Sequence, residues 1–115
     1  MSKRAWIGVD LDGTLAYYDH WRGIEHIGEP IEPMVARVKQ WLADDIYEVR
    51  IVTARVSRDE PGNQWACKFI DEWCERVFGR RLLVTNEKDG SMIELWDDRA
   101  VRVETNTGRL LSQKS

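Results

Sequence analysis

Residues 5–14 decide the fold class, and they read Ala-Trp-Ile-Gly-Val-Asp-Leu-Asp-Gly-Thr. The continuous apolar run at 5–9 is typical of a central strand in a parallel sheet, which is buried on both faces. The run ends at Asp10, and residues two apart in an extended chain point the same way, so Asp10 and Asp12 can converge. Gly13 permits a tight turn directly afterwards. The stretch therefore predicts a buried strand that brings two carboxylates to one edge of a sheet.

Strand and helix patterns alternate along the rest of the chain. Pro33 opens a helix at its first turn, where proline is tolerated, and apolar residues then recur at helical spacing. A second apolar helix face runs from Trp65 to Val77, and Gly79 ends it. Further strands are predicted at residues 48–52, 81–85, 92–96 and 101–104, the last able to form a small hairpin with residues 109–111. This alternation predicts an α/β fold, a Rossmann-like three-layer sandwich whose mostly parallel sheet is covered on both faces.

The bulk composition limits the class of protein. A chain of 115 residues, 43% hydrophobic and 32% charged, fits a single domain over residues 1–115. No apolar run approaches a membrane span and no signal-peptide pattern is present, which favours a cytoplasmic protein without a membrane partner. The net charge of −3 argues mildly against tight binding of nucleic acid. Cys67 and Cys74 stand roughly 10 Å apart along one predicted helix, too far for a disulfide.

Polar residues follow three of the predicted strands. Asp10, Thr53 and Asp97 each stand where a strand ends, and ligands of parallel sheets bind beyond the carboxyl ends of the strands. Asp12 and Asp98 add two more carboxylates to the same edge. Gathered carboxylates repel one another and raise their own pKa values unless a cation lies among them, and hard oxygen ligands suit Mg²⁺. The sequence therefore predicts a magnesium site at this edge.

Four short motifs resemble those of the haloacid dehalogenase (HAD) superfamily of phosphatases. Residues 10–14, Asp-Leu-Asp-Gly-Thr, resemble its first motif, and residues 51–55, Ile-Val-Thr-Ala-Arg, resemble its second. Lys88 is the candidate for the lysine of the third motif, and residues 96–99, Trp-Asp-Asp-Arg, resemble the acidic fourth. The motifs occur in the family's order and span most of the chain. The resemblance implies a sheet in which the fourth strand lies beside the first, with the second strand on its other side.

The resemblance also implies a role for each matched residue. Asp10 would be the nucleophile that forms an aspartyl-phosphate, and Asp12 would protonate the leaving oxygen and then activate water. Thr53 would donate a hydrogen bond to a phosphoryl oxygen, and Lys88 would neutralise developing charge. Asp12 resembles the residue that the phosphatase and phosphomutase branch of the family has at this position, whereas the transport ATPases of the family carry Thr there.

The same resemblance implies the metal and substrate contacts. Mg²⁺ would be held by Asp10, Asp12 (through its main-chain carbonyl), Asp97 and Asp98. Ala54 and Arg55 are expected to contact the substrate phosphate. Arg58 could also reach that phosphate. The alternative for both Arg55 and Arg58 is an ordinary position on the protein surface.

The substrate is expected to be phosphorylated, and several classes stay open. Residues 15–32 and 86–92 are too short to hold a cap domain, so the chain resembles a capless family member with an open site. Such a site suits a nucleic-acid terminal phosphate, or a nucleotide or sugar phosphate if a second subunit of a homo-oligomer supplies a lid. Tyr18 and Trp21 could stack on a base or sugar, or pack over the sheet edge. The alternative function is a binding or regulatory module that keeps the metal but turns over poorly, which a misplaced Lys88 would favour.

Overall fold

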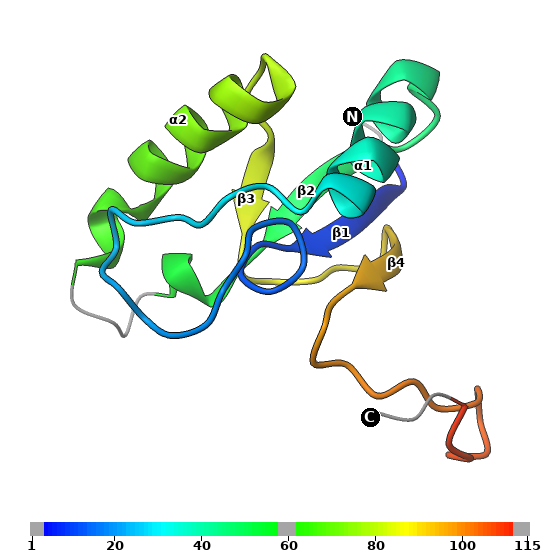
Figure 1. The fold of residues 1–115 in the computed structure, drawn as a ribbon. Helices are drawn as coiled ribbons and strands as arrows, with labels where there is room; N and C mark the ends of the chain where they lie inside the picture. Colours follow the sequence, from blue (N-terminus) through cyan, green and yellow to red (C-terminus); the bar gives the residue numbers. More distant parts are fainter. Residues whose placement is uncertain (1–3, 58–61, 112–115) are drawn as a thin grey trace.

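The computed structural model describes residues 4–57 and 62–111 (Figure 1). Its elements are β1 (Trp6–Asp10), α1 (Glu32–Asp44), β2 (Glu48–Val52), α2 (Ala66–Phe78), β3 (Leu83–Thr85) and β4 (Met92–Trp96), with short 3₁₀ turns η1 (Ala54–Val56) and η2 (Asn63–Trp65). All four strands pair in parallel, in the order β3-β2-β1-β4. The α/β class and the parallel sheet are confirmed, and β4 and β2 flank β1 as expected.

The helix ends follow local sequence. Pro33 lies in the first turn of α1, where a missing N–H costs nothing, and Asp45 ends the helix in the left-handed region. Gly79 ends α2 with φ 77°, and its N–H donates to the carbonyl of Glu75.

No helix in the described part of the chain is both long enough and apolar enough to cross a membrane.

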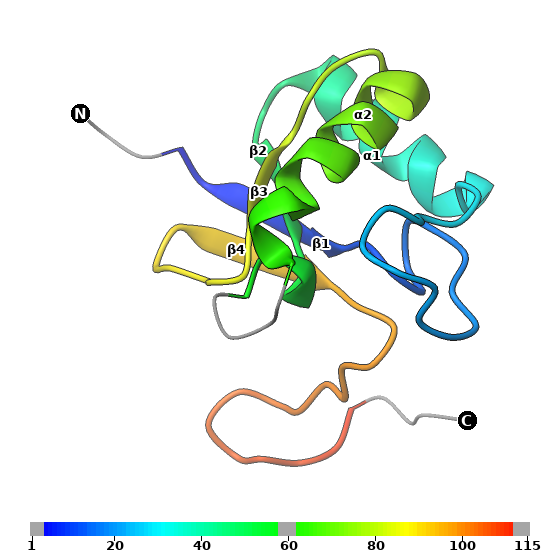
Figure 2. The ribbon, with the colours of Figure 1, turned by 90° about the vertical axis from the view of Figure 1, so that its left-hand side faces the viewer.

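Both helices cover the same face of the sheet (Figures 1 and 2). Val9, Val49 and Ile51 point to that face, because side chains two apart on a strand share a face, and they pack in one core with residues of α1 and α2. The helical contributions to this core are Met34, Val35, Val38, Ala66, Ile70, Trp73 and Cys74. The prediction of three layers is therefore wrong for the described residues, which form two.

The second face lacks a helix because the connection from β3 to β4 is short. Residues 86–91 contain no helix, and a crossover on that side would need about a dozen residues or more. Trp6 is nevertheless fully buried there. The Arg50 guanidinium lies 4.4 Å from the Trp6 ring centroid, and the indole N–H donates to Asp89 at 2.9 Å. A side-chain network thus stands in place of a helix over the start of β1.

Several predicted details differ in the structure. Most of the predicted apolar face of α2 is confirmed, since Ala66, Ile70 and Trp73 are buried, and Cys74 joins them. Trp65 is the exception: it belongs to η2, before α2 begins, and is 57% exposed. The third strand begins at Leu83 rather than at residue 81. Residues 101–104 do not join the sheet: Val103 makes an isolated antiparallel bridge to Leu110, so the hairpin forms and the fifth strand does not. Both cysteines are free, as predicted.

Candidate active site

A hollow of about 800 Å³ lies at the carboxyl edge of the sheet. Asp10 ends β1, Thr53 follows β2 and Asp97 follows β4, and all three line this hollow. The prediction that three strand ends meet at one site is therefore confirmed as geometry. The lining also includes Asp12, Tyr18, Trp21, Ala54, Arg55, Asn63, Asn86 and Arg99.

Three carboxylates form an acidic cluster in this region. One oxygen from each of Asp10, Asp97 and Asp98 lies within 4.8 Å of the others. Burial, together with a hydrogen bond from Asp98 and the negative charges of Asp97 and Asp98, raises the pKa of Asp10 to about 7. A divalent cation among these oxygens would offset that repulsion.

The Gly-Thr pair of the first motif holds Asp98 in this cluster. The Thr14 hydroxyl lies 3.1 Å from Oδ1 of Asp98, and the Asp98 main-chain N–H donates back to the same hydroxyl at 3.0 Å. Gly13 has φ +89°, and a Cβ built on it would lie 2.6 Å from Oδ2 of Asp98. A residue with a side chain would therefore strain the backbone and displace this carboxylate as well.

The Asp12 side chain binds Arg55 instead of joining the acidic cluster. Nε of Arg55 donates to Oδ2 of Asp12 at 2.8 Å, and Nη2 donates to Oδ1 at 2.9 Å. The carboxylate of Asp12 is therefore not among the clustered oxygens, which leaves its main-chain carbonyl as the metal ligand expected from the resemblance.

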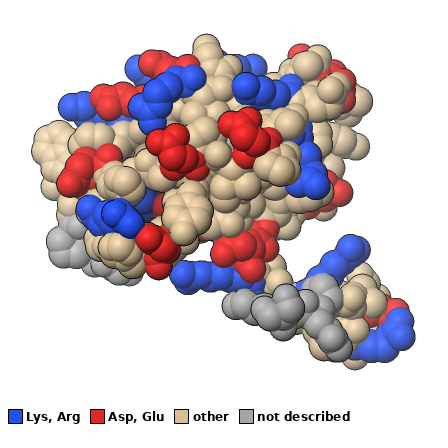
Figure 3. Space-filling model, viewed as in Figure 1, with Lys and Arg blue, Asp and Glu red and all other residues tan. Residues whose placement is uncertain are grey.

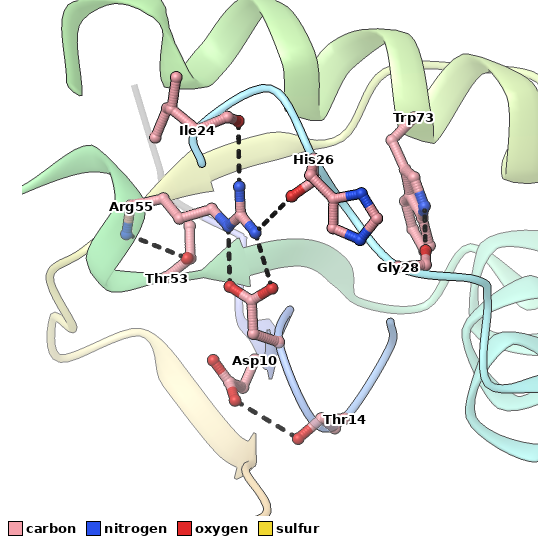
Figure 4. Close-up of polar contacts among 9 residues, drawn as sticks. Asp10, Thr14, Ile24, His26, Gly28, Thr53, Arg55 and Trp73 are labelled. Carbon is pink, nitrogen blue, oxygen red and sulfur yellow. Dashed lines mark hydrogen bonds and ion pairs between the residues drawn. The ribbon is translucent and has the colours of Figure 1, made fainter. Parts of the chain in front are cut away.

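Arg55 is buried, so the surface alternative for this residue is wrong. Besides Asp12, its guanidinium donates to the carbonyls of Ile24 at 3.1 Å and of His26 at 2.8 Å (Figure 4). These contacts tie the loop between β1 and α1 to the hollow, and they commit the guanidinium to protein acceptors rather than to a substrate phosphate. Arg58 lies outside the described residues.

Thr53 is buried and caps the short turn η1. Its hydroxyl accepts a hydrogen bond from the Arg55 main-chain N–H at 3.1 Å, and its own N–H donates to the Thr85 carbonyl at 2.9 Å. Accepting that bond leaves the hydroxyl proton as a donor for a group in the hollow. Ala54, the next residue, is exposed at the rim.

Lys88 is exposed in the β3–β4 connection and is not among the residues that line the hollow. No ion pair joins it to a carboxylate in the described part of the chain. The cation that does line the hollow, apart from Arg55, is Arg99, whose main-chain N–H donates to Asp97 at 2.8 Å. The sequence signal for Arg99 was its position directly after the two aspartates of the fourth motif.

Asn63 and Asn86 also line the hollow, and sequence reasoning missed both. Asn63 begins the short turn η2 and Asn86 lies in the β3–β4 connection, so no spacing rule indicates them. Comparison of the chain with protein-family models, with curated proteins and with solved structures found no match.

Proposed function

We propose that this protein is a Mg²⁺-dependent phosphohydrolase that forms an aspartyl-phosphate on Asp10. The observation that carries the proposal is the half-buried carboxylate of Asp10, which shares a hollow with the Thr53 hydroxyl and lies within 4.8 Å of two further carboxylates. Buried like charges of this kind are arranged at functional sites more often than elsewhere. The four motifs that resemble those of HAD phosphatases give the same assignment.

The donor set fits Mg²⁺. Asp10, Asp97 and Asp98 supply hard, anionic oxygens from a single small volume, and the hollow leaves room for water and phosphate oxygens as further ligands. The raised pKa of Asp10 is the expected signature of a site completed by a cation. When bound, the ion would neutralise the phosphate so that an anionic nucleophile can approach it.

The protein's own residues then divide the reaction. A carboxylate oxygen of Asp10 attacks phosphorus, an O–P bond forms, and the bond to the leaving oxygen breaks. Asp12 gives that oxygen a proton; in the second half a water molecule attacks phosphorus, Asp12 takes its proton, and inorganic phosphate and the Asp10 carboxylate are released. Two hydrogen bonds from Arg55 hold the Asp12 carboxylate in one orientation at the hollow, where it takes part in both halves.

Two donors complete this assignment. Thr53 donates from its hydroxyl to a phosphoryl oxygen, since its main-chain partner leaves that proton available. Arg99 takes the role of charge neutralisation that the resemblance assigns to Lys88, because Arg99 lines the hollow and Lys88 does not.

The test is phosphate release in Mg²⁺ from a panel that contains nucleotides, sugar phosphates and a 3′-phosphorylated oligonucleotide. We expect turnover that disappears with EDTA and in Asp10→Asn, which keeps the shape of the side chain and removes the nucleophile. Release that survives in Asp10→Asn would contradict the proposed intermediate.

The exposed position of Lys88 favours one alternative, a module that binds metal and phosphate without turnover. Titration calorimetry separates the two functions. Binding of Mg²⁺ and of inorganic phosphate, both lost in Asp10→Ala, with no release from any substrate of the panel, would establish the alternative.

A further inference from the structure

Trp21 lies at the mouth of the hollow with much of its surface open. It is 53% exposed, although it is an aromatic residue of the kind that folding usually buries. It lines the same hollow as Asp10 and Thr53. The loop between β1 and α1 therefore presents an indole ring to the space where the phosphate is proposed to bind.

The ring is backed on one side by Arg55. The guanidinium carbon of Arg55 lies 4.8 Å from the Trp21 ring centroid. That guanidinium is itself fixed by hydrogen bonds to Asp12 and to the carbonyls of Ile24 and His26. One face of the indole thus rests on a cation that is hydrogen-bonded to other parts of the protein, which leaves the opposite face open to a ligand.

Arg55 also sets the distance between the ring and the proposed reaction centre. The same guanidinium contacts the Trp21 ring on one side and the Asp12 carboxylate on another. The Trp21 ring and Asp12, the proposed acid and base, are therefore separated by the width of one guanidinium group. In a nucleotide, one sugar separates the flat base from the phosphate.

The size and polarity of the hollow agree with this arrangement. Its volume of about 800 Å³ is in the upper part of the range for small-molecule sites, more than a lone phosphate or sugar phosphate requires. Tyr18 supplies a second aromatic ring, and the amide of Asn86 offers both donor and acceptor groups for a base edge. Asn63 is held in place by donation from its amide nitrogen to the Ser57 carbonyl.

Resting on the proposed phosphohydrolase function, we infer that the substrate is a nucleoside monophosphate whose base stacks on the open face of Trp21 while its phosphate faces Asp10. On the face drawn in Figure 3, acidic and basic side chains are interspersed, without the continuous basic stripe that follows a polynucleotide backbone. Together with the net charge of −3, this favours a free nucleotide over the end of a long strand.

The experiment compares kcat/KM for adenosine monophosphate with kcat/KM for glucose 6-phosphate in the wild type, Trp21→Ala and Trp21→Phe. Loss of base stacking costs about 1–3 kcal/mol, so Trp21→Ala should lower the ratio of the two values by about tenfold or more. Trp21→Phe should keep most of the preference, because phenylalanine retains an aromatic plane. Trp65→Ala is the matched control: Trp65 is equally exposed, at 57%, but does not line the hollow.

An unchanged ratio in Trp21→Ala, or a wild type that prefers glucose 6-phosphate, would overturn the inference. A 5′-phosphorylated oligonucleotide hydrolysed with higher kcat/KM than the mononucleotide would also overturn it, in favour of a strand end. If no phosphate is released from any substrate, the phosphohydrolase function fails, and calorimetry with adenosine monophosphate still tests the ring: binding weakened about tenfold in Trp21→Ala supports nucleotide recognition, and equal binding contradicts it.

Discussion

Gly13 is the residue on which the geometry of the acidic cluster depends most directly. A Cβ at this position would lie 2.6 Å from Oδ2 of Asp98 while the backbone keeps φ +89°. We expect Gly13→Ala to lower stability by about 1–2 kcal/mol from the left-handed backbone alone. Displacement of Asp98 should in addition weaken Mg²⁺ binding by roughly tenfold or more, measured by calorimetry.

Gly62→Ala is the control for this prediction. Gly62 has φ +85°, and a Cβ there would meet nothing within 4 Å. It should lose a similar amount of stability in chemical denaturation and keep the wild-type affinity for Mg²⁺. Equal Mg²⁺ affinity in both variants would show that Asp98 is not a ligand, or that it adjusts to the added methyl group.

Asp10 makes the stability of the metal-free protein depend on pH. Its pKa is raised from 3.8 to about 7 by burial and by Asp98 and Asp97, so between these values the folded state keeps a proton that the unfolded chain has released. Its stabilising effect is therefore full below pH 3.8 and is lost as the pH rises through about 7. We expect the free energy of unfolding in EDTA to fall from pH 4.5 to pH 7.5.

Two comparisons identify Asp10 as the source of this slope. Asp10→Asn cannot ionise and should flatten it, and Mg²⁺ should raise the melting temperature more at pH 7.5 than at pH 4.5, because the ion competes with the proton for the carboxylate. The low pKa of Asp19, about 2, affects stability only below this range. A slope that persists unchanged in Asp10→Asn would assign it to another group.

At the scale of elements, Arg55 connects three segments of chain. It belongs to η1, pairs with Asp12 beyond β1, and donates to two carbonyls of the loop before α1. Removing one partner of a buried ion pair costs about 3–5 kcal/mol, so we expect Arg55→Ala to lower stability by about 3 kcal/mol. Because Asp12 would lose its orientation, kcat should fall by about a hundredfold.

Arg55→Lys separates charge from geometry. Lysine keeps the charge but cannot make a bidentate contact with Asp12 while reaching two further carbonyls, so it should restore only part of the stability and little of kcat. Arg22→Ala is the control, because Arg22 forms an exposed ion pair with Asp19 and should leave both quantities unchanged. Full activity in Arg55→Ala would remove Arg55 from the proposed site.

The elements that the sequence predicted best are those with a continuous or periodic apolar pattern. Residues 48–52 and 92–96 are strands with the predicted bounds, and the strand ends at Asp10, Thr53 and Asp97 meet because all strands run in parallel. The prediction of a third layer was wrong because the connections between strands decide which face of the sheet a helix covers. β1, β2 and β3 follow one another in one direction across the sheet, so right-handed crossovers place α1 and α2 on the same face.

The positions of Arg55 and Trp21 could not be predicted from the sequence for a related reason. Their contact depends on how the loop between β1 and α1 folds over the strand ends, and that loop has no period to interpret. For Lys88, order along the chain suggested a place in the third motif. The short connection between β3 and β4 instead leaves Lys88 exposed and outside the hollow.

At the scale of the whole molecule, the described part of the segment after β4 extends away from the body (Figures 1 and 2). It exposes four large apolar residues: Val101, Val103, Leu110 and Leu111. An isolated two-stranded hairpin is marginally stable in water. The face of the sheet that no helix covers exposes Leu83 and Leu95. The exposed apolar residues of the segment after β4 and those of the uncovered sheet face could therefore bury one another.

We therefore expect the protein to form a dimer in which this segment of one copy packs on the uncovered sheet face of the other. Burying a leucine contributes about 1.5–3 kcal/mol, so Leu110→Asp with Leu111→Asp should weaken the dimer by more than a hundredfold in sedimentation equilibrium. Ile46→Asp is the control, because Ile46 is exposed in the turn between α1 and β2. A wild type that stays monomeric at high concentration would contradict the dimer. A dimer that survives in the double variant would place the contact elsewhere, because an aspartate pair cannot remain buried on an apolar face without losing most of this energy.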